Sequence, residues 1–407
     1  MNLQYAKTGK SLKLIEHIAS GGQGEVWTTS DTKIVAKLYK QTMTSEQVEK
    51  LQVMSEDPPN DPALRKGHVS IAWCIDLLKD QQNNFVGYAM PKVQNSRTIL
   101  NVFLPTLRNK VALGFNWYYL HQTAQNLASV VQAIHQKNYV IGDIKAENLL
   151  VNASAQVSIV DTDSFQIRNS ATGKVYRCLV GTGSYTPPEL LGKNLQTVDR
   201  LELHDRFGLG IIIYQLLFGY HPFLGVLDTP EQLSLEERIS KGLWLHSPNA
   251  TVKPGRFSIP LEVVHPSLRT CFQKCFTVGY ENPHLRPTAT EWYQALKLAI
   301  ADLTVCSHSP EHHYTKTNRR CCWCDYKAKT SVDLFPPVPS TPKTHKIKTP
   351  SPVVTTVGPT PRNNSLATNN PIAWILALTI SLSLIIPPIR QELVIPMFRQ
   401  IVQTFTR

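Results

Sequence analysis

Apolar and polar residues alternate in short runs over the first hundred positions of the chain. In residues 34–39, IVAKLY, the side chains of Ile34, Ala36 and Leu38 fall on one face of an extended segment and Lys37 on the other. This pattern is typical of strands that bury one face. The first hundred residues therefore predict short strands, together with one helix.

From about residue 112 the apolar residues follow a helical period instead. They recur at steps of four and three, as on the buried face of a helix: Leu120, Ala124, Leu127, Val131 and Ile134. Because the strands come first and the helices later, the sequence predicts an α+β fold with a small β-rich lobe followed by a larger helical lobe.

Beyond residue 330 the composition changes. Residues 331–370 are rich in proline, threonine and lysine without an apolar period, which predicts a disordered linker. Residues 371–389 carry no charge and would form a helix roughly 28 Å long, about the thickness of the hydrocarbon core of a bilayer. We expect one transmembrane helix there, with an interfacial or packed segment as the alternative. Residues 390–407 would be a short amphipathic tail.

Net charge and cysteine content indicate which partners and which metal sites to expect. The net charge of +12 over 407 residues suggests an anionic partner such as a nucleotide or lipid headgroups, although much of the excess lies in the tail, and we expect no nucleic-acid partner. The first residues lack an uninterrupted apolar core, so we expect no secretory leader. Four of the eight cysteines lie between Cys306 and Cys324, which then favours metal ligation over disulfides.

Three polar residues, Asp143, Lys145 and Asn148, lie together between two apolar segments. Near the N-terminus, residues 18–27 (IASGGQGEVW) form a glycine-rich turn whose backbone amides could approach phosphate oxygens. Lys37 follows on the next predicted strand. A glycine run alone is a weak signal, so its meaning depends on the other motifs.

A short apolar strand ends in Asp161, thirteen residues after Asn148. An amide and a carboxylate at the ends of paired strands can hold Mg²⁺ through oxygen atoms. Asp143 is then free to accept or orient a hydroxyl proton, and Lys145 can neutralise a transferring phosphoryl group. Together these groups match the needs of phosphoryl transfer.

In this order the motifs resemble those of the protein kinase family, over residues 12–300. The resemblance implies the two-lobed protein kinase fold, a small N-lobe and a larger C-lobe, with ATP and Mg²⁺ as cofactors. It implies Asp143 as the catalytic base, Lys145 as its neighbour that stabilises charge, and Asn148 and Asp161 as Mg²⁺ ligands.

The same resemblance assigns the nucleotide contacts to the glycine-rich loop, the strand lysine and the hinge between the lobes: Ala19, Gly21, Gly22, Gly24, Val26, Lys37, Met90 and Val93. Three further matches, Asp205, Glu189 and Arg286, are implied to be structural groups that hold the catalytic loop and the lower lobe.

The sequence departs from the family pattern before and after this loop. Ile141 and Gly142 stand where the family usually has His-Arg, so activity should not need a phosphate clamped by that arginine. Thr162 and Asp163 replace the Phe-Gly that usually follows the metal-binding aspartate. Asp163 could be a second metal ligand, but we favour a hydrogen-bonding role near the strand end.

The family pairs its strand lysine with a glutamate on a helix. The segment TSEQVEKLQVM offers Glu46 and Glu49, which are three residues apart and so close to one face. We favour Glu49 because it lies among Val48 and Leu51, which suits an inward-facing position.

The last cysteines suggest a second site in residues 301–330. Cys321 and Cys324 form a C-x-x-C motif, Cys306 lies fifteen residues upstream, and three histidines lie between. Such spacing suits tetrahedral Zn²⁺. The set we favour is Cys306, His313, Cys321 and Cys324. The segment resembles the cysteine-histidine knuckle that follows the kinase domain in some bacterial kinase-like proteins, and we expect a structural role.

The sequence therefore predicts an ATP- and Mg²⁺-dependent serine/threonine protein kinase that acts on a protein hydroxyl. A single membrane span would tether it to the cell membrane, with the kinase domain in the cytoplasm, where ATP and reduced thiols are available. The alternative is a catalytically weak or inactive nucleotide-binding pseudokinase scaffold at the membrane.

Overall fold

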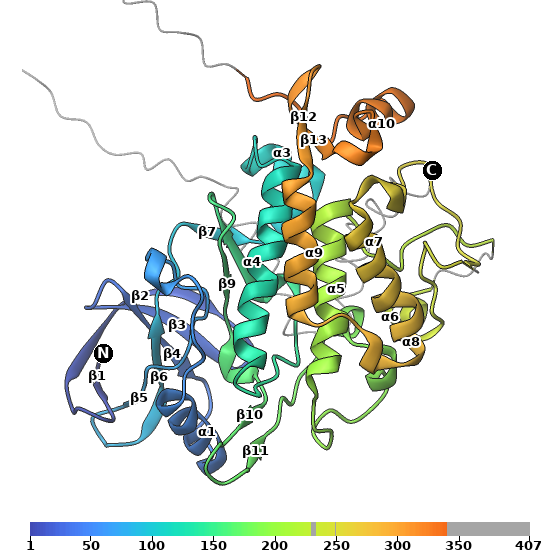
Figure 1. The fold of residues 1–407 in the computed structure, drawn as a ribbon. Helices are drawn as coiled ribbons and strands as arrows, with labels where there is room; N and C mark the ends of the chain where they lie inside the picture. The colour runs from blue at the N-terminus through green and yellow to red at the C-terminus, as the bar shows by residue number, and fades with distance from the viewer. Residues whose placement is uncertain (229–232, 249, 340–407) are drawn as a thin grey trace, which may run out of the picture. The chain divides into compact units, whose positions relative to one another are not determined.

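The computed structural model describes residues 1–339, apart from 229–232 and 249 (Figure 1). The predicted membrane span, residues 371–389, and the tail after it lie outside the described residues. Among the helices that are described, none is long and apolar enough to cross a membrane.

Six antiparallel strands form the small N-terminal lobe and close into a barrel in the order β1-β2-β3-β4-β6-β5 (Figure 1). The strands are β1 (Asn2–Tyr5), β2 (Ser11–Ser20), β3 (Gly24–Thr29), β4 (Ile34–Tyr39), β5 (Asp76–Lys79) and β6 (Phe85–Pro91). The alternation predicted for β4 is confirmed. Ile34, Ala36 and Leu38 pack in one apolar cluster with residues of β1, β2 and β5, whereas Val35 and Tyr39 pack on the larger core.

Helix α1 (Ser45–Glu56) follows β4 and is the predicted helix of this lobe. Thr44 caps its first turn reciprocally with Gln47, which satisfies two backbone N–H groups that would otherwise lack partners. Leu51 and Met54 are buried, and the indole of Trp73 donates a hydrogen bond of 2.6 Å to the Met54 carbonyl. These contacts fix which face of α1 is turned inward.

The larger lobe is built around helices α4 (Trp117–His135), α5 (Glu202–Phe218) and α9 (Ala289–Ala301) (Figure 1). The predicted apolar stripe of α4 is buried at all five positions, and α4 packs against both α5 and α9. The other helices are α2 (Leu100–Phe103), α3 (Pro105–Val111), α6 (Leu235–Ser240), α7 (Pro266–Gln273) and α8 (Gly279–Glu281).

Short strands bring the polar loop of Asp143 close to Asp161. Strands β7 (Ser96–Thr98), β8 (Leu149–Asn152) and β9 (Val157–Ile159) form a sheet in that order, with Leu149 of β8 opposite Ile159 of β9. This register brings the residues just before β8 close to those just after β9. A hairpin of β10 (Ile167–Arg168) and β11 (Val175–Tyr176) follows.

The C-terminal part of the described chain is a small unit on the larger lobe. It contains the hairpin β12 (Leu303–Cys306) and β13 (Ser309–Thr315) and helix α10 (Cys322–Thr330). The Trp323 ring meets Trp117 of α4 edge-on at 4.8 Å and Phe335 at 4.9 Å. Phe335 is buried beneath the Arg108 guanidinium. Residues 331–370 were assigned from composition to the disordered linker, but Leu334 and Phe335 pack on the larger core, because Phe335 supplies an apolar anchor.

Candidate functional site

Asp143 is buried at the centre of the loop between α4 and β8. Its carboxylate accepts hydrogen bonds from Lys145 Nζ at 2.7 Å and from the hydroxyl of Thr182 at 2.8 Å. The structure thus joins Asp143 and Lys145, as predicted, and adds Thr182, which the sequence motifs did not indicate.

The buried carboxylate of Asp205 holds this loop through backbone hydrogen bonds. Asp205, near the start of α5, accepts hydrogen bonds from the backbone N–H groups of Ile141 at 2.7 Å and Gly142 at 2.8 Å. The side chain of His135 lies 2.9 Å from the same carboxylate. The implied structural role of Asp205 agrees with this geometry.

The glycine in place of the family's arginine has a steric cause. Gly142 adopts φ +74°, and a Cβ added there would lie 2.7 Å from the sulfur of Cys178. A side chain at this position would therefore be strained and would collide with the segment after β11. Arg200, which the motifs did not indicate, is buried and donates to the carbonyls of Gly142 at 2.7 Å and Val180 at 2.8 Å. It ties the loop to that segment through neutral carbonyls.

Asn148 and Asp161 lie beside each other, as the strand register requires. The backbone N–H of Val160 donates to the Asn148 carbonyl at 3.0 Å. Asp161 has φ +61°, a conformation rare for residues other than glycine, and its side chain is 42% exposed. Carboxylate and amide oxygens are ligands that Mg²⁺ prefers, so this pair fits the metal that the sequence predicts.

The partner of Lys37 differs from the prediction. Its ammonium donates to Asp161 at 2.6 Å and to both oxygens of Asp163 at 2.6 and 2.8 Å. Burial alone would lower the pKa of Lys37, but Asp163 and Asp161 outweigh it and raise the pKa above its usual value. The assignment of Glu49 to Lys37 is wrong in this structure, because Glu49 is exposed on α1 and pairs with Lys174.

The glycine-rich turn joins β2 and β3, and β3 pairs with β4, the strand of Lys37. Ala19 lies opposite Val26 on these strands, and Val26 lies opposite Lys37 on the next pair. Gly21 donates its N–H to the Gly24 carbonyl at 2.8 Å. Of the predicted nucleotide contacts, Ala19, Gly24 and Val26 therefore lie on β2 and β3, and Gly21 and the exposed Gly22 lie in the turn between these strands.

Close packing explains one of these glycines. A Cβ on Gly24 would lie 2.5 Å from the Leu38 carbonyl, so only glycine fits at that position. The predicted hinge follows on β6, where Met90 is buried opposite Val35. Val93 lies two residues beyond the end of that strand.

Glu189 and Arg286 form the predicted structural pair. The two guanidinium nitrogens donate to the two carboxylate oxygens at 2.6 and 2.8 Å, and the arginine is buried. Arg286 also donates to the carbonyls of Leu203 and Gly279. A bidentate pair with additional backbone partners satisfies a buried charge well.

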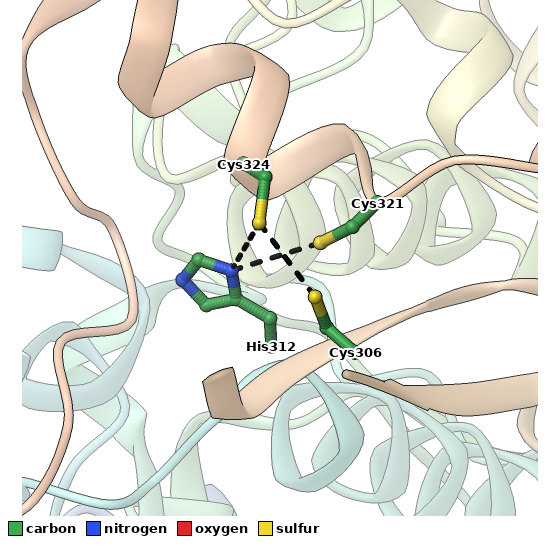
Figure 2. A group of neighbouring side chains, drawn as sticks. All are labelled: Cys306, His312, Cys321 and Cys324. Atoms are coloured by element: carbon green, nitrogen blue, oxygen red, sulfur yellow. Dashed lines mark hydrogen bonds between the residues drawn. The ribbon is translucent and has the colours of Figure 1, made fainter. Parts of the chain in front are cut away.

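The described residues contain a second candidate site in the C-terminal unit. Figure 2 shows Cys306, His312, Cys321 and Cys324 turned toward one another, and their possible ligand atoms all lie within 4.8 Å of one another. His312 Nδ1 is 3.5 Å from Cys324 Sγ and 3.6 Å from Cys321 Sγ. Three thiols and one imidazole in this arrangement could hold a metal ion such as Zn²⁺.

The prediction of His313 as the histidine of this set is wrong, because its neighbour His312 lies in the cluster. Successive residues of a strand point to opposite faces, and on β13 it is His312 that faces the cysteines. His313 faces α4 instead, where its ring lies 5.8 Å from that of Tyr118. His312 Nε2 is also 3.0 Å from the Asp333 carboxylate, a contact that orients the imidazole with Nδ1 toward the thiols.

The domain family and two known proteins that this chain matches are protein kinases. Residues 12–296 match the protein kinase domain family. The protein kinase YegI of Escherichia coli is 30% identical over 328 residues, which cover 79% of this chain and 49% of that protein. The serine/threonine-protein kinase PknA of Mycobacterium tuberculosis is 26% identical over 219 residues, 51% of this chain and 47% of that protein. The chain spans about half the length of these relatives.

Proposed function

Because the chain belongs to the protein kinase family, we propose that it is a serine/threonine kinase that transfers the γ-phosphoryl group of ATP to a protein hydroxyl. The observation that carries this proposal is the contact between the Thr182 hydroxyl and the Asp143 carboxylate at 2.8 Å. It shows that a hydroxyl group can reach the carboxylate at hydrogen-bond distance, which is what a general base requires of its acceptor.

The other residues take roles that follow from their charge and position. Lys37 would bind phosphate oxygens of ATP beneath the glycine-rich turn, and Lys145 would stabilise negative charge beside the acceptor. Asn148 and Asp161 would hold Mg²⁺. When bound, that ion supplies positive charge that offsets the charge of the phosphates.

The test is phosphoryl transfer from labelled ATP by the full chain, with Asp143→Ala and Asp143→Asn as variants. We expect incorporation into serine or threonine of a generic protein acceptor, with a loss of about 10²–10⁴-fold in either variant, because that is the usual contribution of a general base. Measurable ATP binding without any incorporation by the wild-type protein would instead favour the nucleotide-binding scaffold.

We also propose that the C-terminal unit binds one structural Zn²⁺ through Cys306, His312, Cys321 and Cys324. The mutual approach of these four side chains supports it. Metal analysis of the purified protein should give about one equivalent of zinc, and His312→Ala should lower it. His313→Ala is the matched control, since that ring faces away from the cysteines. Equal zinc loss in both histidine variants would contradict the ligand set.

Membrane tethering by residues 371–389, with the kinase domain in the cytoplasm, is a further proposal. Its support is the uncharged apolar run in the sequence alone. Fractionation tests it: the full chain should stay with membranes after alkaline washing, and a variant without residues 371–389 should not. Release of the full chain by the wash would refute a spanning segment.

A further inference from the structure

We propose that Asp163 is the positioning residue for Lys37, in the role that a glutamate of helix α1 would otherwise have. This inference rests on the proposed kinase function and names how its nucleotide-binding lysine is held. Compared with the family pattern, the carboxylate and a lysine have exchanged places. The turn after β9 supplies the carboxylate of Asp163, and helix α1 supplies Lys50.

The carboxylate of Asp163 is buried and has four hydrogen bonds. Both oxygens accept from Lys37, at 2.6 and 2.8 Å. The hydroxyl of Tyr39 donates at 2.7 Å and that of Tyr88 at 2.8 Å. A buried carboxylate with this many donors is held in one orientation, and it fixes the ammonium in turn.

Helix α1 cannot supply this carboxylate from its present position. Its two candidate glutamates, Glu46 and Glu49, are exposed, and Glu49 pairs with Lys174. The residue that reaches inward is Lys50, whose Nζ donates to the Asp163 backbone carbonyl at 2.6 Å. Lys50 therefore attaches the helix to the turn that carries Asp163.

The two aspartates differ in the exposure of their side chains, which points to different roles. The side chain of Asp161 is 42% exposed and that of Asp163 is 4% exposed. Asp161 is thus accessible to a ligand, whereas Asp163 is enclosed with Lys37. Because one short turn carries both, the position of Lys37 is set by the same backbone as the predicted metal ligand. The carboxylate that holds Lys37 therefore does not come from α1.

Steady-state kinetics of the full chain provide the first test. Asp163→Asn keeps the shape and removes the charge, so kcat/KM for ATP should fall about 10- to 100-fold, the usual range for a lost hydrogen bond between charged groups. Glu49→Gln, which removes the carboxylate expected from the family pattern, should stay within about twofold of the wild type. A loss in Glu49→Gln that equals or exceeds the loss in Asp163→Asn would overturn the proposal.

The second test does not depend on turnover. Lys37 is modified with an amine-reactive reagent at one fixed pH, and the rate of its labelling is read by mass spectrometry. Asp163→Asn should speed the labelling of Lys37, because the carboxylate that holds its ammonium is lost, and labelling of exposed Lys66 should not change. An unchanged rate at Lys37 would refute the contact. Faster labelling of Lys37 in a variant of a protein without kinase activity would separate failure of the proposed function from failure of this inference.

Folding of each variant is checked by thermal unfolding. If Asp163→Asn does not fold, Tyr88→Phe takes its place, because it removes one hydrogen bond to the carboxylate and leaves the charge. We then expect kcat/KM for ATP to fall up to about tenfold. If Tyr88→Phe has wild-type kinetics while Glu49→Gln is impaired, the positioning role of Asp163 is refuted.

Discussion

Loss of a proton from His135 should destabilise the folded protein as the pH rises through about 8. His135 is the last residue of α4 and is buried, with Nε2 at 2.9 Å from Asp205 and Nδ1 at 3.5 Å from Glu202. Burial alone would lower the pKa of His135, but the two carboxylates outweigh it and raise the pKa to about 8. Its ring is therefore protonated near neutral pH.

The size of the effect follows from the difference between the folded and unfolded pKa. An unfolded histidine has a pKa of about 6.5, so the shift is about 1.5 units, and at about 1.36 kcal/mol per unit the protonated ring contributes about 2 kcal/mol to the free energy of unfolding. Because the folded pKa is the higher one, this contribution is complete below pH about 6.5. It is lost as the pH rises through about 8.

The assay is urea unfolding of the wild type and His135→Gln between pH 6 and 9. Glutamine can still donate to Asp205 but does not titrate, so the wild type should lose about 2 kcal/mol more than the variant over this range. His121→Gln is the control, because burial lowers the pKa of His121 to about 4 and its ring is neutral throughout. An equal pH dependence in His135→Gln and the wild type would refute the reasoning.

Three further substitutions test the packing around the site. Gly142→Arg restores the family's arginine but places a side chain at φ +74° against Cys178, so thermal unfolding should show a loss of about 2 kcal/mol or more; unchanged stability would contradict the steric explanation. Arg286→Met leaves the Glu189 carboxylate without its partner and should cost about 3 kcal/mol in urea unfolding, whereas a cost below about 1 kcal/mol would mean that solvent replaces the pair. Trp323→Ala removes the ring that packs on α4 and should make the C-terminal unit sensitive to protease while the protein keeps the zinc content that we propose; simultaneous zinc loss would show that packing and metal binding are inseparable.

Much of the site was predictable because its residues lie in short motifs. Lys37 could be placed from the alternation of one strand, since the period of two assigns each side chain to a face. Asp143, Lys145 and Asn148 lie within six positions, and the register of β8 with β9 brings Asp161 to them. The order of these motifs along the chain carries the family resemblance.

The sequence also implied the long-range pair of Glu189 and Arg286, but only through that resemblance. The contacts of Thr182 and Arg200 with the catalytic loop had no such signal. They depend on how the segment after β11 folds back, and nothing in the local spacing of either residue fixes that path. Gly142 is a partial exception, because an unexpected glycine indicates a special backbone position even before its neighbour Cys178 is known.

By itself, the sequence determined which residue types the two sites use and their order in the chain. Only the tertiary structure decided which neighbour in a helix or strand faces the site. On α1 a rotation of one residue separates Glu49 from Lys50, and the packing of Leu51, Met54 and Trp73 chooses Lys50. On β13 the pleat separates His312 from His313, and the pairing with β12 turns His312 toward the cysteines. Both choices follow from contacts between elements distant in sequence, so local patterns could narrow them to neighbours but not select between them.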